Sequence, residues 1–401
     1  MSPAIRGATF ALGLGLWPTL AWASPLTADD VVRHTLDHHP DVVAAHGAVG
    51  AASGYRHDVA AFVDNPEAEV GVAVVGDLVQ GGVMQPLSLT GEGWHARRAA
   101  RGAEEAATAD ERRSTFVLAA EARAAYVRAR AAEERARLGD EALAQAGRLR
   151  AALEDRGRAG EVSPLDVRLA RLSEARAAAE AVDAHREATE ARTALAAFHP
   201  DAATAELVDP IEVAAPPAAV TGERSDVLAV AARVEEASAE LARTRASALP
   251  PVGVGAMFQR DAGEWDVGPQ VAVEIPLWTR NRGDIGAARA DLATTEAEAD
   301  RLRAVAAAEA TGTARTAAFA DDALGRLGDV DTDAREALAS VERALAAGDL
   351  GVSDAVLLRT EILDGWTAGV DAREARSLAR LDAMLAVESE LLLAPAAEEE
   401  R

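Results

Sequence analysis

The residues best suited to chemistry in this 401-residue chain are histidines near its start. His34 and His38 lie one helical turn apart, so a helix would place both imidazoles on one face, where they can bind a borderline divalent metal. The alternative is a polar helix start before Pro40, without metal. No third ligand at a fixed spacing accompanies the pair, so we predict neither a resident metal nor a cofactor.

Other catalytic arrangements are missing from the sequence. The chain has no cysteine, which excludes disulfides, thiolate zinc sites and cysteine nucleophiles. The Gly253-Val254-Gly255 run lies in a strand pattern with no helix start after it, so it is not a dinucleotide-binding loop. No serine, histidine and aspartate occur in a recognisable catalytic context. We predict that the protein is not an enzyme.

Composition and charge narrow the class of protein further. The formal net charge of −25 argues against a nucleic-acid partner. Aromatic residues make up only 3% of the chain, whereas 49% of it is hydrophobic, and much of that is alanine. Small side chains suit thin layers of closely packed helices better than one thick globular core.

Residues 1–23 have the pattern of a secretory signal peptide. One arginine precedes a short apolar stretch, and Ala21-Trp22-Ala23 supplies small residues at both positions that a signal peptidase reads. We therefore expect the mature chain to be exported. No later segment has a continuous apolar run long enough for a transmembrane helix.

Proline-free runs indicate where long helices can form, because proline blocks a helix interior. The two longest runs are Leu87–Ser163 and Leu277–Ala394. Within the first, Trp94–Arg156 consists mainly of strong helix formers and would give a rod of roughly 95 Å. That length is typical of a coiled coil or a long helical hairpin.

Short segments before each run alternate between apolar and small or polar residues, which predicts half-buried strands. In the first half these segments are Glu69–Val74 and, more weakly, Gly81–Leu87. In the second half they are Val252–Gln259 and Gln270–Ile275. Such strands fit a soluble sheet, or a barrel with lipid outside and water inside.

The two halves of the chain repeat one order of elements: helix, strand, strand, long helix, turn and returning helix. We expect a first repeat at 24–200, a linker at 201–223, a second repeat at 224–392 and an acidic tail at 393–401. The β-hairpins are expected at 67–87 and 251–277, and the long helical hairpins at 93–199 and 283–392.

Four short strands cannot close a barrel alone, and an open sheet edge is not tolerated in hydrocarbon. Three copies would supply twelve strands, a number within the range of outer-membrane barrels. The long helices would then form a cylinder below the barrel. The predicted fold is mostly α with a small β part, and it forms a trimeric 12-stranded β-barrel continuous with a long α-helical barrel.

With this organisation the chain resembles the TolC-type outer-membrane efflux channel family over nearly all of its mature length. The most specific matching motifs are Gly160–Asp166 and Asn281-Arg282-Gly283. Shorter matching runs are His38–Asp41, Gln85-Pro86-Leu87, Arg97-Arg98, Arg158-Ala159 and Ile275-Pro276-Leu277. The Gln-Pro-Leu turn followed by paired arginines looks most like the heavy-metal efflux subgroup.

The resemblance implies a passive homotrimeric export duct in the outer membrane, in contact with its lipid, with a periplasmic helical domain. It also implies that the helical tips dock on a periplasmic adaptor (membrane fusion) protein, while an inner-membrane pump such as an RND transporter drives export. The residues implied at the adaptor-contacting tips are Arg158, Gly160, Val162, Ser163, Leu165, Gly348, Leu350 and Ser353.

A pore constriction is the further site that the resemblance implies. Asp354 matches a family position shortly after the tip glycine Gly348, and Asp349 lies beside that glycine. Three copies of such an acid would concentrate negative potential in a narrow pore. The alternative is that Ser353 or Asp354 only caps the following helix. The second acid of the family's double ring is replaced by Leu357 here.

Several residues have structural interpretations. Ser163-Pro164 fits an N-cap and first helical position, and Gly160 and Gly348 fit turn residues. Aromatic side chains gather at membrane boundaries, and the candidates here are Phe62, Phe258, Trp265 and Trp278. Two other functions fit long helical hairpins: a periplasmic adaptor and a soluble coiled-coil scaffold protein. An adaptor should have one such hairpin, whereas this chain has two similar halves.

Overall fold

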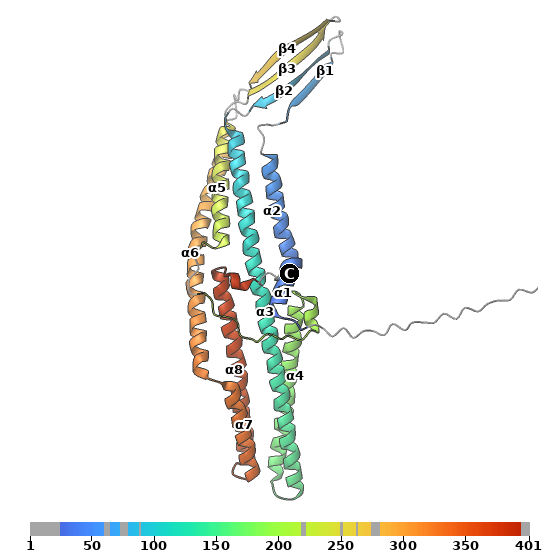
Figure 1. The fold of residues 1–401 in the computed structure, drawn as a ribbon, viewed down its shortest axis with the longest axis vertical. Coiled ribbons are helices and arrows are strands. Elements are labelled where there is room, and N and C mark those ends of the chain that lie inside the picture. Colours follow the sequence, from blue (N-terminus) through green and yellow to red (C-terminus); the bar gives the residue numbers. More distant parts are fainter. Residues whose placement is uncertain are drawn as a thin grey trace, which may run out of the picture.

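A computed structural model describes residues 25–59, 65–72, 79–87, 90–217, 222–248, 252–261, 264–273 and 281–393. The expected signal peptide at 1–23 and nearly all of the expected acidic tail lie outside these residues. The described chain is elongated, with a small sheet at one end and two helical tips at the other (Figure 1). None of its described helices is long and apolar enough to cross a membrane.

The first half of the chain contains two shorter helices, two strands and a long helical hairpin. These elements are α1 (Ala28–His38), α2 (Pro40–Asp58), β1 (Glu67–Val72), β2 (Val79–Leu87), α3 (Glu92–Arg158) and α4 (Pro164–Leu195). The 67-residue α3 corresponds to the long helix expected from the first proline-free run. At about 1.5 Å per residue it is roughly 100 Å long.

The second half repeats this order with differences. A 3₁₀ turn, η1 (Pro200–Ala203), precedes α5 (Ser225–Ala246), β3 (Val252–Asp261), β4 (Glu264–Val273), α6 (Arg282–Leu327), α7 (Val330–Ala347), α8 (Val352–Ala386) and η2 (Glu390–Leu392). The chain is thus mostly helical with a small antiparallel sheet, which confirms the predicted fold class at that level.

The start of the first half differs from the prediction. His39 has an extended backbone (φ −66°, ψ 134°) because Pro40 disfavours the helical conformation in the residue before it. As a result α1 ends at His38, and a separate helix begins at Pro40. The helix start expected at Pro40 is therefore present, with His39 as its N-cap. His34 and His38 lie instead at the end of the preceding helix, so the expectation of a polar helix start at these two residues was wrong.

The long helix of the second half is divided as well. α6 ends at Leu327, and Gly328 adopts φ +68°, a left-handed value that stops the helix. The Asp329 side chain then caps α7 by accepting a hydrogen bond from the Thr332 N–H at 3.1 Å. The second helical hairpin thus has a joint between sheet and tip, whereas α3 runs without interruption.

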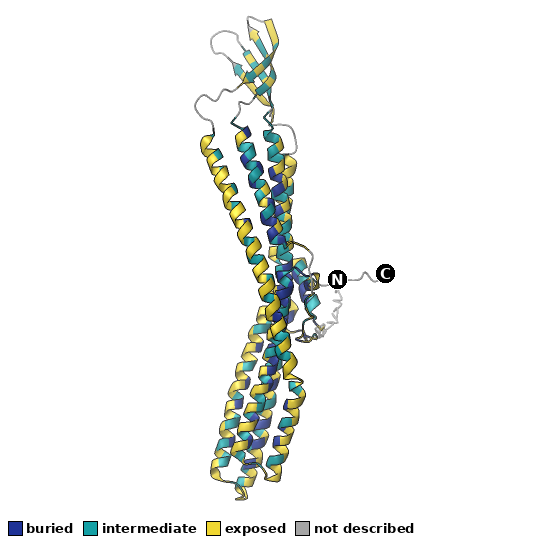
Figure 2. Ribbon diagram, turned by 90° about the vertical axis from the view of Figure 1, so that its left-hand side faces the viewer, coloured by how far each residue is buried: buried dark blue, intermediate teal, exposed yellow. Residues whose placement is uncertain are grey.

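The main core lies midway along the helices, where buried residues concentrate in Figure 2. Its largest side chains include Tyr126 of α3 and Trp366 of α8. The segment expected as a linker contributes to this core: Leu207 forms a parallel β-bridge with Leu26, and Ile211 is buried. The core therefore ties the start of the described chain to the junction between the two halves.

Contacts of α5 fix the position of the second β-hairpin. Gly102 of α3 allows a close approach to α5, because a Cβ atom there would lie 2.9 Å from the Glu236 backbone nitrogen. At the start of α5, the buried Glu388 carboxylate accepts hydrogen bonds from the Ser225 N–H at 2.9 Å and hydroxyl at 2.5 Å. Since α5 leads into β3, these contacts position the sheet relative to the helices.

Candidate functional site

The described strands form one antiparallel sheet in the order β1-β2-β3-β4, so the hairpins of the two halves meet through β2 and β3. Opposite residues of an antiparallel pair share a face, and the register therefore assigns the side chains to two faces. We call the first the apolar face. Its members include Ala68, Val70, Val83, Leu87, Val252, Val254, Ala256, Phe258, Trp265, Val267, Val271 and Val273.

The opposite surface, which we call the polar face, carries mainly acidic, amide and glycine residues. Its larger members are Glu67, Glu69, Gln80, Met84, Met257, Gln259, Glu264, Asp266 and Gln270. A shallow cavity of about 390 Å³ lies against this face. On the apolar face, by contrast, most valines are exposed, with 76% of Val267 and 71% of Val70 accessible. The apolar face is therefore suited to contact with hydrocarbon, and the polar face to contact with water.

Both outer strands of the sheet have a free edge within the described chain. β1 pairs only with β2, and β4 pairs only with β3. The outward backbone N–H and C=O groups of both strands therefore need water or another chain as partner. Exposed valines beside these edges make pairing with another strand favourable.

Aromatic and basic side chains lie together on the apolar face at the β3–β4 turn, the end of the sheet remote from the helices. The rings of Phe258 and Trp265 are 6.1 Å apart, and the Arg260 guanidinium is 5.7 Å from the Trp265 ring centre. Two of the four aromatic boundary candidates thus share one level of the sheet. The other two, Phe62 and Trp278, lie outside the described residues.

The first tip connects α3 to α4. Gly160 has φ +78°, which confirms it as the turn residue. The Ser163 hydroxyl accepts a hydrogen bond from the Asp166 N–H, and the Asp166 carboxylate accepts one from the Ser163 N–H, both at 3.2 Å. This capping box, with Pro164 at the first helical position, confirms the predicted start of α4.

The second tip connects α7 to α8 and lacks such a cap. Gly348 has φ +81°, as expected for its turn. The N-cap of α8 is Gly351, and no side chain caps this helix. The alternative that Ser353 or Asp354 is the N-cap was therefore wrong. Asp354 lies exposed in the first turn of α8, and Asp349 is exposed beside Gly348.

The two tips pack against each other through a small apolar cluster. Leu149 and Leu153 of α3 are buried there together with Ala170 of α4, and Val162 and Leu345 pack against them. Of the residues expected to contact an adaptor, Val162 and Leu350 are half-buried. The exposed ones are Arg158, Gly160, Ser163, Leu165, Gly348 and Ser353.

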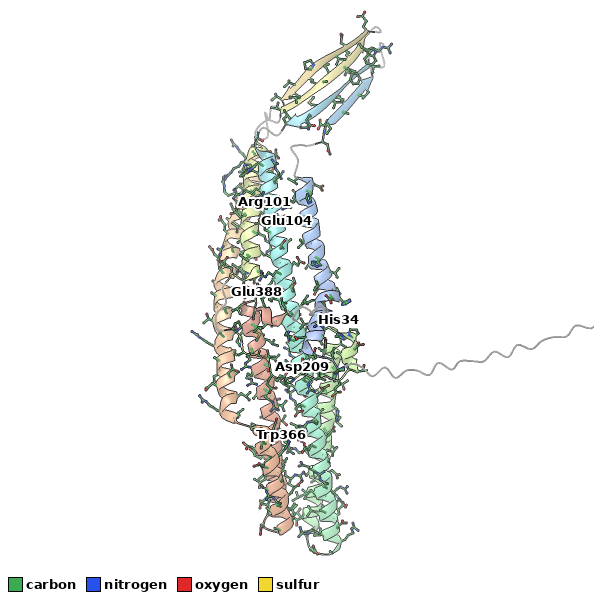
Figure 3. All side chains as sticks on the ribbon, in the orientation of Figure 1. His34, Arg101, Glu104, Asp209, Trp366 and Glu388 are labelled. Carbon is green, nitrogen blue, oxygen red and sulfur yellow. The ribbon has the colours of Figure 1, made fainter. Side chains whose placement is uncertain are left out.

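The histidines form a ring cluster. The centroids of His34 and His38 are 4.4 Å apart, and His199 lies 4.5 Å from His34. Burial lowers the pKa of His34, and the neighbouring His199 and His38 lower it further, which favours the neutral ring. Among the described residues, no three side chains are arranged to hold a metal ion. Figure 3 places His34 midway along the molecule, away from sheet and tips.

Sequence reasoning missed one buried charge near the tips. Arg359 of α8 is only 8% exposed, and its guanidinium donates a hydrogen bond to the side-chain oxygen of Gln145 on α3 at 3.1 Å. No local pattern distinguishes this arginine from the many solvated ones on the same helices. Its burial results from the packing of α8 against α3.

Of the comparisons with known proteins, the one with solved structures finds proteins of similar fold. No protein-family model matches the chain, and no curated protein matches its sequence. A solved membrane protein from Pseudomonas aeruginosa is 20% identical at a TM-score of 0.74, over 90% of this chain and 93% of that one. The outer membrane protein VceC of Vibrio cholerae is 18% identical with the same TM-score, over 90% and 95% of the two chains.

A third solved structure, the CmeC outer membrane channel of Campylobacter jejuni, is 13% identical at a TM-score of 0.76, over 96% of this chain and 93% of that one. At these low identities the likeness concerns the fold alone, which is that of TolC-type channels. It confirms the mostly helical fold with a small antiparallel sheet that we expected for one chain.

The capping box at the first tip yields a stability prediction. Ser163→Ala removes a side-chain cap and should lower the free energy of unfolding by about 0.5–2 kcal/mol. Ser353→Ala is the matched control, because Ser353 makes no cap and its loss should cost less than about 0.5 kcal/mol. Denaturant titration of both purified variants measures the difference, and equal losses would contradict the assignment of caps.

Proposed function

We propose that this chain is one subunit of a passive homotrimeric channel in the outer membrane. The main support is that the four-stranded sheet has two chemically different faces and that both of its edges are unpaired among the described residues. The likeness in fold to outer membrane channels supports the same conclusion.

The free edges support assembly of three copies. An unpaired edge is costly in hydrocarbon, where no water is available to bind the backbone groups. If β4 of one subunit pairs with β1 of the next, three copies close a cylinder of twelve strands, a size found among outer-membrane barrels. Closure in this way leaves no edge exposed to lipid. It also turns the polar face of each sheet towards a common lumen.

The length of the apolar face suits the outer membrane. Along β4, apolar side chains recur from Val273 to Trp265, roughly 27 Å of strand. At a strand tilt of about 40° this corresponds to a height of roughly 20 Å, close to the apolar band of about 25 Å in such barrels. Trp265 and Arg260 then lie at the outer boundary, where aromatic and basic side chains are favoured. The helices extend from the opposite end, into the periplasm.

We propose that the helical tips dock on a periplasmic adaptor protein and that an inner-membrane pump, such as an RND transporter, drives export. Exposed residues at both tips, among them Arg158, Leu165 and Ser353, offer the contact surface. The duct itself needs no catalytic group, and we propose that it is not an enzyme. The sheet shared by two similar halves argues against the adaptor and the soluble scaffold alternatives.

We further propose that Asp354, with Asp349 nearby, narrows and charges the pore at the second tip. Asp354 is exposed and is not the N-cap of α8, which leaves its carboxylate accessible and supports this proposal. Three symmetry-related copies would raise the local concentration of cations at the constriction.

The lipid-facing assignment predicts unequal effects of two substitutions on one strand. Val267→Arg places a charge on the apolar face near mid-strand and should cost about 2–4 kcal/mol per chain. Gln270→Arg lies at a similar depth on the polar face and should fold and assemble nearly as well as the parent. The measurement is the amount of heat-resistant oligomer in the outer-membrane fraction. Equal loss in both variants would overturn the assignment of faces.

The pore assignment predicts a change in ion selectivity. Asp354→Asn should lower the permeability ratio of cations to anions by roughly twofold or more in planar bilayers, because negative potential is lost at the constriction. Asp183→Asn, an exposed aspartate on α4 away from the tips, should leave the ratio unchanged. If the two variants behave alike, Asp354 does not form the constriction.

A further inference from the structure

A groove between the two helical hairpins, a short way above the tips, has features of a ligand site. Its volume is about 580 Å³, and α3, α7 and α8 line it. Leu149, Leu153 and Val341 form an apolar floor, and each is less than a tenth exposed. Volumes of this size are typical of pockets that hold small molecules.

The polar end of the groove is a buried cation that has no hydrogen-bonded carboxylate partner among the described residues. Arg359 is 8% exposed, and its guanidinium bonds only to Gln145, at 3.1 Å to the side-chain oxygen and 3.4 Å to the backbone oxygen. Within the described part of the chain, it makes no ion pair with a carboxylate. Burial lowers the pKa of Arg359 more than the nearby Glu342 carboxylate raises it, which reflects the cost of holding this charge away from water.

Charge around the groove also favours an anion. Three arginines line it, Arg148, Arg156 and Arg359, against two acids, Glu161 and Glu342. Of these, Arg156 is already paired with Glu161 at 3.4 Å. The groove is therefore locally basic in a chain whose net charge is −25. A buried arginine normally has a hydrogen-bonded anionic partner. Among the described residues Arg359 has none, because Glu342 acts on it through its charge but makes no hydrogen bond or ion pair with it.

We propose that this groove binds a small amphipathic carboxylate, with its carboxyl group on Arg359 and its apolar body on Leu149, Leu153 and Val341. The planar guanidinium matches a carboxylate in two parallel hydrogen bonds, and the floor buries a short hydrocarbon chain. The proposal does not depend on the trimer or on transport, since all of the lining residues belong to one chain.

Calorimetric titration with hexanoate tests the proposal on the full-length protein in a neutral detergent, with empty micelles as the reference. Hexanoate should bind, whereas hexanol and hexylammonium, which match its apolar body, should bind at least about tenfold more weakly. Equal binding of hexanol would mean that the apolar floor alone accounts for the affinity, and this result would overturn the proposal. So would an absence of hexanoate binding above that of the micelles.

Variants distinguish binding of hexanoate to the buried Arg359 from nonspecific electrostatic attraction of hexanoate to the basic groove. Arg359→Met should weaken hexanoate binding about tenfold or more, while the rim variant Arg148→Gln should change it by less than about twofold. Ala346→Phe keeps Arg359 but fills the groove, and it should also weaken binding. Thermal melting checks folding, and Arg359→Met should not lower the melting temperature, because it removes an unpaired buried charge. Equal effects of Arg359→Met and Arg148→Gln would contradict the site.

Discussion

The proposed trimer depends on backbone hydrogen bonds that the two outer strands do not make within the described part of one chain. β1 and β4 each present an unpaired backbone edge, and exposed valines continue up to both edges. Water can satisfy such groups, but hydrocarbon cannot. If the apolar face contacts lipid, as we propose, the sheet has all of its backbone groups paired only when other copies bind to both edges. This requirement links the fold of one chain to its assembly and to the proposed lumen.

The helical part is long and thin, so its helices must pack closely to bury enough surface for stability. Alanine and glycine allow this: Gly102 brings α3 and α5 into close contact, and the tips share only a small cluster around Leu149 and Leu153. Large side chains such as Tyr126 and Trp366 are concentrated midway, where the junction between the halves joins the core. The low aromatic content is consistent with a thin wall held by many small contacts.

Local signals in the sequence predicted those parts of the fold that local physics controls. Alternating valines predicted the strands, the proline-free run predicted α3, and Ser163-Pro164 predicted the start of α4. Gly328 was not recognised as a helix break, because helix-forming residues continue on both sides of it in the sequence. There the backbone conformation of one residue interrupts a favourable helical composition.

The candidate sites were less predictable, because they depend on contacts between distant segments. His199 joins His34 only when the junction of the halves folds back, and Arg359 becomes buried only when α8 packs on α3. The predicted N-cap of α8 was wrong for a related reason. Serine and aspartate, the types at Ser353 and Asp354, are favoured at N-caps, but the N-cap of α8 is Gly351. Residue type alone did not fix which position begins the helix.

Cysteine cross-linking tests most directly whether three copies close the sheet, since the chain has no cysteine of its own. Glu69→Cys on β1 and Gly268→Cys on β4 would place two thiols on the polar face, three strand spacings or roughly 14 Å apart within one chain. A short thiol cross-linker then joins only neighbouring chains. Glu67→Cys with Met84→Cys, which lie opposite each other in β1 and β2, is the control for linkage within a chain. We expect a covalent trimer for the first pair and a monomer for the control. A monomer from both pairs would contradict closure of the sheet by three copies.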